Sequence, residues 1–140
     1  IIDHVIATVT VHAALKNISV RKTIQSEHVT ISADRDRLEQ ILLNLADNAI
    51  KFTQRGEVEI GKGEESGKTY IFVKDTGVGI PRKYLSRLGE RCFRVDPSRS
   101  RELGGTGLGL AIVKHLVRAH GWEMKIESEE GRGTVVKIVL

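Results

Sequence analysis

Four glycines stand within six residues at positions 104–109, where the sequence reads Gly-Gly-Thr-Gly-Leu-Gly, and an apolar-periodic run follows them to about residue 120. Glycine loses more backbone freedom on ordering than any other residue, so a cluster indicates unusual backbone angles or close approach to a ligand. The first N–H groups of the following helix lack intrahelical partners, and the helix dipole favours an anion there. We therefore predict phosphate binding at this helix start. A mobile loop followed by an ordinary helix is the alternative interpretation.

A second candidate group lies on a predicted helix over residues 35–52. Asn44, Asn48 and Lys51 are spaced i, i+4 and i+7, so they follow one edge of that helix. Asparagine is unfavourable inside helices because its amide competes for backbone hydrogen bonds. Carboxamide oxygens suit Mg²⁺ when substrate phosphates complete its ligand shell, and a lysine can meet a phosphate as a point charge. The alternative interpretation is a solvated helix face.

A third candidate is a single acid at a predicted strand end, in the segment 75–81, Asp-Thr-Gly-Val-Gly-Ile-Pro. The glycines and the proline make a sharply turned loop that presents the carboxylate of Asp75. An ionised carboxylate only accepts hydrogen bonds, so it can bind an exocyclic amine such as that of adenine. Alternatively, Asp75 caps a helix in a plain turn.

The segment 91–101 is polar and contains four arginines, and it leads into the glycine cluster. Such a segment has little apolar surface to bury, so we expect a mobile, lid-like loop. Arginines beside a triphosphate are electrostatically favourable. A solvated charged loop is the alternative, and Arg94 is the one arginine singled out here.

Hydrophobic periodicity predicts the elements that position these groups. Residues 35–52 form the clearest helix, with a continuous apolar face and Asp34 as its N-cap. Further helices are predicted for residues 1–16, 82–91 and 108–120. Gly121 is the predicted stop of the last helix. Strands are predicted for residues 18–24, 29–31, 57–61, 69–74, 123–127 and 134–140, with polar loops at 63–68 and 128–133 closing two hairpins.

Composition limits the class of protein. A chain of 140 residues, 40% hydrophobic and 29% charged, is typical of one globular domain. The net charge of +4 is mild and only 4% of residues are aromatic, which argues against a dedicated nucleic-acid surface. The single cysteine, Cys92, excludes an internal disulfide and fits a reducing compartment. No apolar run has membrane-spanning length. Because the chain begins at Ile1 rather than Met, we expect it to be a piece of a longer protein.

The predicted order of five or more strands and three or four helices favours an α+β fold, a two-layer sandwich with the helices on one sheet face. Four motifs then follow one another along the chain, at residues 44–53, 75–81, 93–96 and 105–112. Together they closely resemble the catalytic and ATP-binding domain of sensor histidine kinases, with its N box, G1 box, F-box region and G2 box. The resemblance covers essentially all of the chain and is nearest to the phosphate-sensing type. It implies a Bergerat ATP-binding fold, with a mixed, mainly antiparallel sheet and a mobile ATP lid.

The resemblance also implies a role for each matching residue. Asn48 would be the Mg²⁺ ligand, and Asn44 and Lys51 would lie near the phosphates. Asp75 would bind the adenine amine directly, with Thr134 assisting through water. Arg94 would approach the γ-phosphate during transfer, acting in catalysis with Asn44 and Lys51. The other nucleotide contacts implied are Phe52 against the base, Gly77, Gly79 and Ile80 of the G1 loop, and Gly105, Thr106, Gly107, Leu108 and Gly109 around the phosphates.

One position separates kinases from fold relatives. Gyrase-, Hsp90- and MutL-like ATPases carry a glutamate four residues before the metal-binding asparagine, where it activates water as a general base. This chain has Asn44 there, whose amide cannot take a proton. The resemblance therefore favours phosphoryl transfer to an external acceptor over hydrolysis.

Two features fall short of a complete kinase. Gly89 and Cys92 stand where the F box usually carries phenylalanines, which puts the order of the lid and the transfer rate in question. None of the five histidines has the setting of a phosphoacceptor, so we expect the acceptor histidine on a dimerisation segment upstream of Ile1.

The sequence thus predicts that residues 1–140 form a single catalytic domain of a longer, two-component histidine kinase. It would bind Mg·ATP or ADP and transfer the γ-phosphoryl to a histidine on the dimerisation domain, for onward transfer to the receiver domain of a response regulator. We expect a cytoplasmic location, with no nucleic-acid partner and no direct membrane contact. The alternatives are a nucleotide-binding regulatory module with weak or absent transfer and, third, an ATPase of the same fold.

Overall fold

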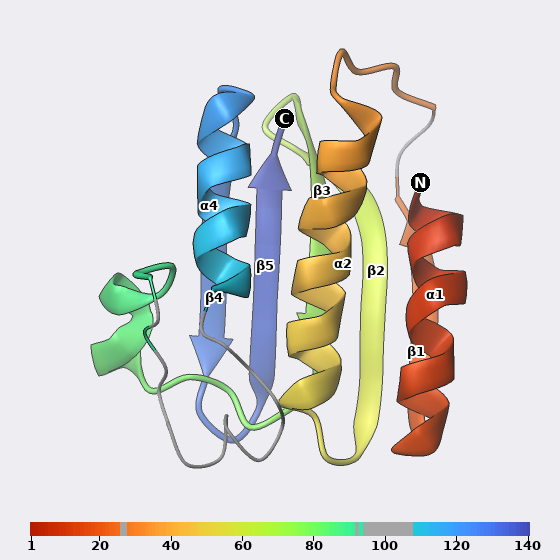
Figure 1. Ribbon diagram of the computed structural model, residues 1–140, viewed down its shortest axis with the longest axis vertical. Coiled ribbons are helices and arrows are strands. Elements are labelled where there is room, and N and C mark those ends of the chain that lie inside the picture. The colour runs from red at the N-terminus through yellow and green to blue at the C-terminus, as the bar shows by residue number, and fades with distance from the viewer. Residues whose placement is uncertain (26–27, 92, 94–107) are drawn as a thin grey trace.

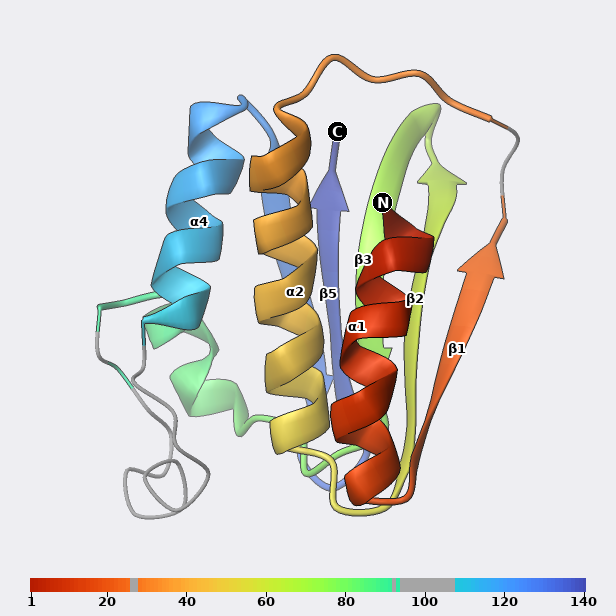
Figure 2. The ribbon, with the colours of Figure 1, turned by 45° about the vertical axis from the view of Figure 1, so that its right-hand side comes forward.

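A five-stranded sheet carries the α-helices of the described residues on one face (Figures 1 and 2). The computed structural model describes residues 1–25, 28–91, 93 and 108–140. The strands lie in the order β1-β2-β3-β5-β4. Only β1 and β2 pair in parallel, and the other three pairings are antiparallel. The predicted α+β sandwich with a mixed, mainly antiparallel sheet is confirmed. In chain order, the elements are α1 (Ile2–Leu15), β1 (Ile18–Ile24), α2 (Arg35–Lys51), β2 (Gly56–Glu65), β3 (Lys68–Asp75), the 3-10 helix η1 (Arg82–Arg87), α4 (Gly109–Ala119), β4 (Glu123–Glu129) and β5 (Gly133–Val139).

Helix α2 lies at the centre of the helical layer, and its sequence explains why. The predicted N-cap is confirmed, because the Asp34 carboxylate accepts hydrogen bonds from the backbone N–H groups of Asp36 and Arg37. The predicted apolar face is also buried against the sheet and the neighbouring helices. Its members are Leu38, Ile41, Leu42, Leu45, Ala46 and Ala49.

Helices α1 and α4 flank α2 and complete the core. Helix α1 buries Val5, Val9 and Ala13, which follow one another at every fourth residue. Helix α4 ends at Ala119, and Gly121 takes a positive φ of 73°, so the predicted glycine stop is confirmed.

Some predicted details are wrong. The helix predicted for residues 82–91 is only the 3-10 helix η1, which ends at Arg87. The segment 29–31 is not a strand, because it belongs to the connection that crosses the top of the molecule from β1 to α2 (Figure 2). The predicted loop 63–68 is mostly strand, since β2 runs to Glu65 and β3 begins at Lys68. Ser66 and Gly67 both have positive φ, of 52° and 73°, which is the geometry of a two-residue hairpin turn.

The sheet face without helices is partly covered by its own aromatic side chains. Phe72 of β3 is only 6% exposed there, although the described α-helices lie on the opposite face. It pairs across the sheet with Gly61, and a β-carbon at Gly61 would lie 2.9 Å from the end of its ring. Because Gly61 has no side chain, the Phe72 ring can lie against it.

Candidate functional site

A pocket of about 370 Å³ opens between the C-terminal half of α2 and the inner face of the sheet. The loop after β3, the segment beyond η1 and the first turn of α4 form its other walls. Its floor is built from two rows of residues that pair across β3, β5 and β4. One row is Asp75, Thr134 and Ser128, of which Ser128 does not itself line the pocket, and the next is Val73, Val136 and Ile126.

Asp75 ends β3 at the polar end of this floor. Its carboxylate oxygen Oδ1 accepts a hydrogen bond of 2.9 Å from the backbone N–H of Gly77. Burial raises the pKa of Asp75 above its ordinary value, while the backbone N–H groups of Gly77 and Thr134 act in the opposite direction. The pocket therefore holds a half-buried acid whose carboxylate faces mainly apolar surroundings.

The loop glycines after Asp75 are held against protein backbone. A β-carbon at Gly77 would lie 2.3 Å from the carbonyl oxygen of Phe52, and one at Gly79 would lie 2.1 Å from that of Glu129. Gly79 also has a φ of +68°, which other residues rarely adopt. Between them, the Val78 N–H donates to the Phe52 carbonyl oxygen at 3.1 Å. Close packing onto α2 and the β4–β5 hairpin therefore requires both glycines, whether or not a ligand is bound. Gly79 lines the pocket and Gly77 does not.

The residues predicted to follow one edge of α2 do not all line the pocket. Asn48 and the helix-ending Phe52 line the pocket, whereas Asn44 and Lys51 are not among its lining residues. Asn44 instead donates from its amide nitrogen to the Gln40 carbonyl oxygen at 2.9 Å. Its amide oxygen lies against the start of α4, 3.2 Å from where a β-carbon of Gly109 would be. The absence of a side chain at Gly109 lets α4 begin beside Asn44.

Part of the predicted phosphate-binding segment lies outside the described residues, namely Arg94, Gly105, Thr106 and Gly107. Leu108 and Gly109 are described: Leu108 precedes α4 and Gly109 is its first residue. Leu110, in the first turn of α4, lines the pocket. The start of α4 therefore lies at the pocket's edge.

The β4–β5 hairpin contributes Thr134, which was predicted, and Ser128, which was not. Thr134 lines the pocket beside Asp75, its partner in the sheet. Ser128 is the sheet partner of Thr134 on β4, on the side away from Asp75, with 2.8 Å between their hydroxyl oxygens. The Ser128 hydroxyl also accepts the backbone N–H of Ile80 at 2.8 Å, which attaches the loop after β3 to the hairpin.

Sequence reasoning also missed the apolar walls. Strand alternation offered a signal for the residues on the inner face of the sheet. Phe93 begins the motif at residues 93–96, but neither it nor Leu88 was predicted to line the pocket. The lining residues not predicted individually are Leu45, Ala49, Val73, Val78, Pro81, Leu88, Phe93, Leu110, Ile126, Glu130 and Val136.

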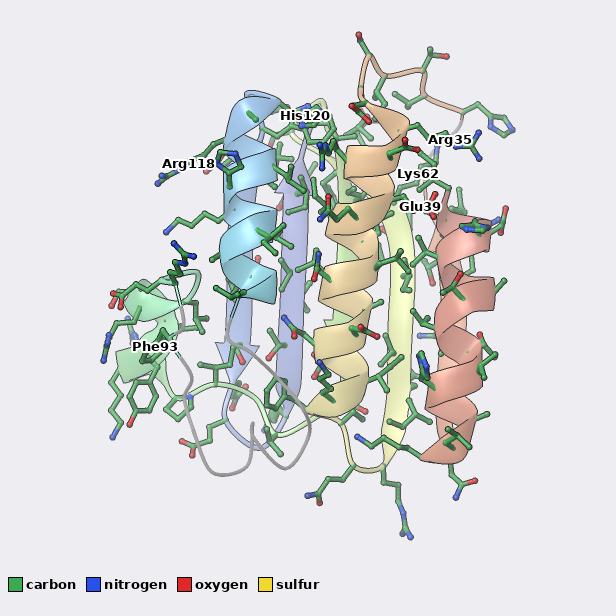
Figure 3. All side chains as sticks on the ribbon, viewed as in Figure 1. Arg35, Glu39, Lys62, Phe93, Arg118 and His120 are labelled. Atoms are coloured by element: carbon green, nitrogen blue, oxygen red, sulfur yellow. The ribbon has the colours of Figure 1, made fainter. Side chains whose placement is uncertain are left out.

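Gly89 has a structural reason for lacking the phenylalanine expected there. Its φ is +82°, and an added β-carbon would lie 2.9 Å from the Lys114 side chain of α4. Phe93, labelled in Figure 3, supplies an aromatic ring nearby, 6.1 Å from the ring of Tyr84. The guanidinium of Arg87 lies 4.2 Å from the centre of the Phe93 ring.

The pocket suits a flat, largely apolar ligand that carries a hydrogen-bond donor and a negatively charged tail. Its walls are aliphatic and aromatic, and Asp75 offers a hydrogen-bond acceptor. Asn48 and the start of α4 lie where a tail could reach a carboxamide oxygen and the positive end of the helix dipole. In the described ranges, no three His, Cys, Asp or Glu side chains gather as a metal site, and no helix has the length and apolar character needed to cross a membrane.

Residues 33–140 match the family model described as "Histidine kinase-, DNA gyrase B-, and HSP90-like ATPase". The chain is 41% identical over 110 residues to sensor histidine kinase YkoH of Bacillus subtilis, a match that covers 79% of this chain and 24% of that protein. It is 40% identical over 122 residues to sensor histidine kinase WalK of the same bacterium, covering 85% of this chain and 20% of that protein. The chain thus spans about a quarter or less of the length of these curated relatives.

Solved structures agree with the sequence matches. Full-length ShkA in complex with AMPPNP aligns with a TM-score of 0.86 at 34% identity, covering 99% of this chain and 28% of that one. The mycobacterial sensor histidine kinase MprB aligns with a TM-score of 0.80 at 30% identity, covering 99% of this chain and 90% of that one. The family model, the relatives and the fold lead to one conclusion: this chain belongs to the histidine kinase-, DNA gyrase B- and HSP90-like ATPase family, on its histidine kinase branch.

Proposed function

We propose that this chain binds Mg·ATP and serves as the catalytic domain of a sensor histidine kinase. The observation that carries the proposal is the half-buried Asp75 carboxylate at the polar end of an apolar pocket, with Asn48 on the facing helix. The complex of the structural neighbour ShkA with AMPPNP, an ATP analogue, supports a nucleotide as the ligand. Asp75 would accept a hydrogen bond from the adenine amine, and Phe52 and Ile80 would contact the base.

The polar edge of the pocket fits the phosphates. Asn48 lines it and offers a carboxamide oxygen, a suitable ligand for Mg²⁺ that is also bound by nucleotide phosphates. When bound, the metal ion would neutralise charge on the phosphates during transfer. Asn44 lies against the first residue of α4, so its side chain is close to the helix start that would meet the phosphate chain. Lys51, Arg94 and the glycines of residues 105–109 complete the proposed phosphate site.

Transfer is favoured over hydrolysis by the residue at position 44. A general base there would have to take a proton from water, and the amide of Asn44 instead donates a hydrogen bond to the Gln40 carbonyl oxygen. We therefore propose a histidine on a separate dimerisation domain as the phosphoryl acceptor, and a receiver domain as the next acceptor. Positioning and charge neutralisation would supply most of the catalysis.

A second candidate function is a regulatory module that binds nucleotide but transfers phosphate weakly. Gly89 favours it, because its positive φ disfavours the phenylalanine usual at this position. The segment between η1 and α4 thus lacks an aromatic side chain at position 89.

Titration calorimetry and a transfer assay test these proposals in sequence. ADP should bind the wild-type chain, more tightly with Mg²⁺ than without, and the Asn48→Ala variant should lose the Mg²⁺ dependence. Labelled ATP should then label the histidine-bearing dimerisation domain of the same kinase when the chain is added. Binding without transfer would establish the regulatory module, and steady phosphate release would establish an ATPase. A wild-type chain that binds neither ADP nor ATP would refute the proposed function.

A further inference from the structure

The Ser128 hydroxyl makes three short contacts behind the pocket floor. Its oxygen lies 2.8 Å from the backbone nitrogen of Ile80, 3.0 Å from the carbonyl oxygen of Gly133 and 2.8 Å from the hydroxyl oxygen of Thr134. Ile80 and Thr134 line the pocket, whereas Ser128 itself does not. Ser128 therefore acts on the pocket only through its neighbours.

When all three contacts are made as hydrogen bonds, counting protons gives one consistent set of directions. A hydroxyl has one proton to donate and two lone pairs that accept. The Ile80 nitrogen can only donate, and the Gly133 carbonyl oxygen can only accept. Ser128 thus gives its one proton to Gly133 and accepts from Ile80. Its remaining contact can be satisfied in one way, with the Thr134 hydroxyl donating its proton to Ser128.

This arrangement leaves Thr134 with only lone pairs to offer the pocket. Thr134 is the sheet partner of Asp75, so the two side chains lie next to each other on the inner face. The Asp75 carboxylate is also an acceptor. The polar end of the pocket therefore presents two neighbouring acceptors, which match the two hydrogens of an exocyclic amine and repel a carbonyl oxygen.

We propose that Ser128 is a specificity-determining positioning residue, which holds Thr134 as a hydrogen-bond acceptor and so makes the pocket select a 6-amino purine over a 6-oxo purine. The inference rests on the proposed nucleotide binding and adds the selectivity between purine bases. Asp75 takes one hydrogen of the amine, and Thr134 takes the other directly or through a water molecule. Without Ser128, the Thr134 proton is free to turn toward the ligand and meet a 6-oxo group.

The test compares ADP with inosine diphosphate, which differs from ADP only in carrying a 6-oxo group and the N1 proton that accompanies it. Wild-type protein should bind ADP far more tightly. In the Ser128→Ala variant, ADP should bind less tightly, and the affinity for inosine diphosphate should fall less than that for ADP or even rise. The ratio of the two affinities should therefore fall about three- to tenfold, the range expected for one hydrogen bond. Ser128→Thr, which keeps a hydroxyl, should restore the ratio.

Further variants separate this role from a structural one. Ser19→Ala removes an exposed serine hydroxyl from β1, outside the pocket, and should leave both affinities unchanged. In a Thr134→Val background, Ser128→Ala should no longer change the affinity ratio, because Ser128 acts through the Thr134 hydroxyl. If Ser128→Ala does not fold, Ser128→Cys supplies a weaker donor and acceptor and should lower the ratio partway.

The outcomes are distinguishable. Equal losses for the two nucleotides in Ser128→Ala would show that Ser128 only anchors the loop through Ile80, which overturns the inference. Wild-type protein that binds both nucleotides equally would overturn it too, while leaving nucleotide binding intact. Wild-type protein that binds neither nucleotide would instead refute the proposed function on which the inference rests.

Discussion

Asp75 is a proposed binding residue whose buried carboxylate lowers the stability of the folded protein when it is ionised. Its carboxylate is half-buried beside the apolar side chains of Val73 and Val136, and burial raises its pKa. A raised pKa means that the folded protein binds the proton more tightly than the unfolded chain does. This tighter proton binding stabilises the folded protein fully at pH values below the pKa that Asp75 has in the unfolded chain. The stabilisation is lost as the pH rises through the higher pKa of Asp75 in the folded protein. At neutral pH the ionised carboxylate therefore disfavours the folded state.

We predict that Asp75→Asn stabilises the nucleotide-free protein at neutral pH and weakens ADP binding roughly tenfold to a hundredfold. Asparagine keeps an oxygen for the Gly77 N–H but has no charge to desolvate and accepts the adenine amine less strongly. Thermal unfolding measured across pH should show the gain in stability shrinking as the pH falls toward 3.8, the ordinary value for this carboxyl.

Asp47→Asn is the matched control, because Asp47 is an exposed carboxylate on α2 that does not line the pocket. It should change neither the unfolding temperature nor the affinity for ADP appreciably. An Asp75→Asn variant that is less stable than wild type at neutral pH would contradict the argument from burial.

At the scale of elements, α2 is held at both ends, but only one end serves the pocket. Asp34 caps its N-terminus, far along the helix from Asn48. At its C-terminus, the Lys16 ammonium donates to the carbonyl oxygens of Ile50 and Lys51, at 2.6 and 3.2 Å. A positive charge is favourable there because the carbonyl groups in the last turn of a helix carry the negative end of its dipole. Phe52, which lines the pocket, is the next residue.

Variants at the two ends should therefore differ in their effect on binding. Asp34→Ala should cost about 1 kcal/mol of stability and leave the affinity for ADP unchanged. Lys16→Met should cost about 1–3 kcal/mol and also weaken ADP binding, because the turn that carries Asn48 and Phe52 loses its anchor. Denaturant unfolding gives the stabilities, and calorimetry on fully folded samples gives the affinities. Equal affinities for the two variants would mean that Lys16 contributes to stability alone.

Considered as a whole molecule, the pocket joins parts of the chain that are far apart in sequence. Asn48 and Phe52 come from α2, Asp75 from the end of β3, and Thr134 from β5 near the C-terminus. The helices cover only the inner sheet face, so the pocket lies between the two layers of the sandwich (Figure 1). A ligand bound there contacts both layers and should oppose their separation on unfolding.

We predict that Mg·ADP stabilises the whole domain against heat. At a ligand concentration one hundred times its Kd, the gain should be about 2.7 kcal/mol, which corresponds to a Tm increase of roughly 5–11 °C for a chain of this size. Differential scanning calorimetry at several ADP concentrations measures it. The Asp75→Asn variant should show a much smaller shift at the same concentrations. A Tm independent of ADP in wild type would contradict binding to the native state.

Much of the fold could be predicted because local rules decide it. The i, i+3, i+4 pattern and Asp34 predicted α2, the positive φ of Gly121 agrees with its predicted role as a stop, and alternation predicted five of the strands. The errors arose where tertiary context decided. Residues 29–31 have strand-forming side chains, but the connection to α2 carries them across the sheet rather than along it. Strands β2 and β3 extend through polar residues because each provides hydrogen-bond partners for the other.

The sequence by itself determined the chemistry of this protein: a carboxylate before a glycine loop, amides spaced along a helix, a glycine cluster before another helix, and through them the kinase family. Only the tertiary structure decided which of these groups share a pocket. It brought Asn48, Phe52, Asp75 and Thr134 together and turned Asn44 toward the start of α4. It also placed Ser128 beside Thr134. Residues 75, 128 and 134 meet through strand register, and that register depends on pairing between distant segments, which no local pattern records.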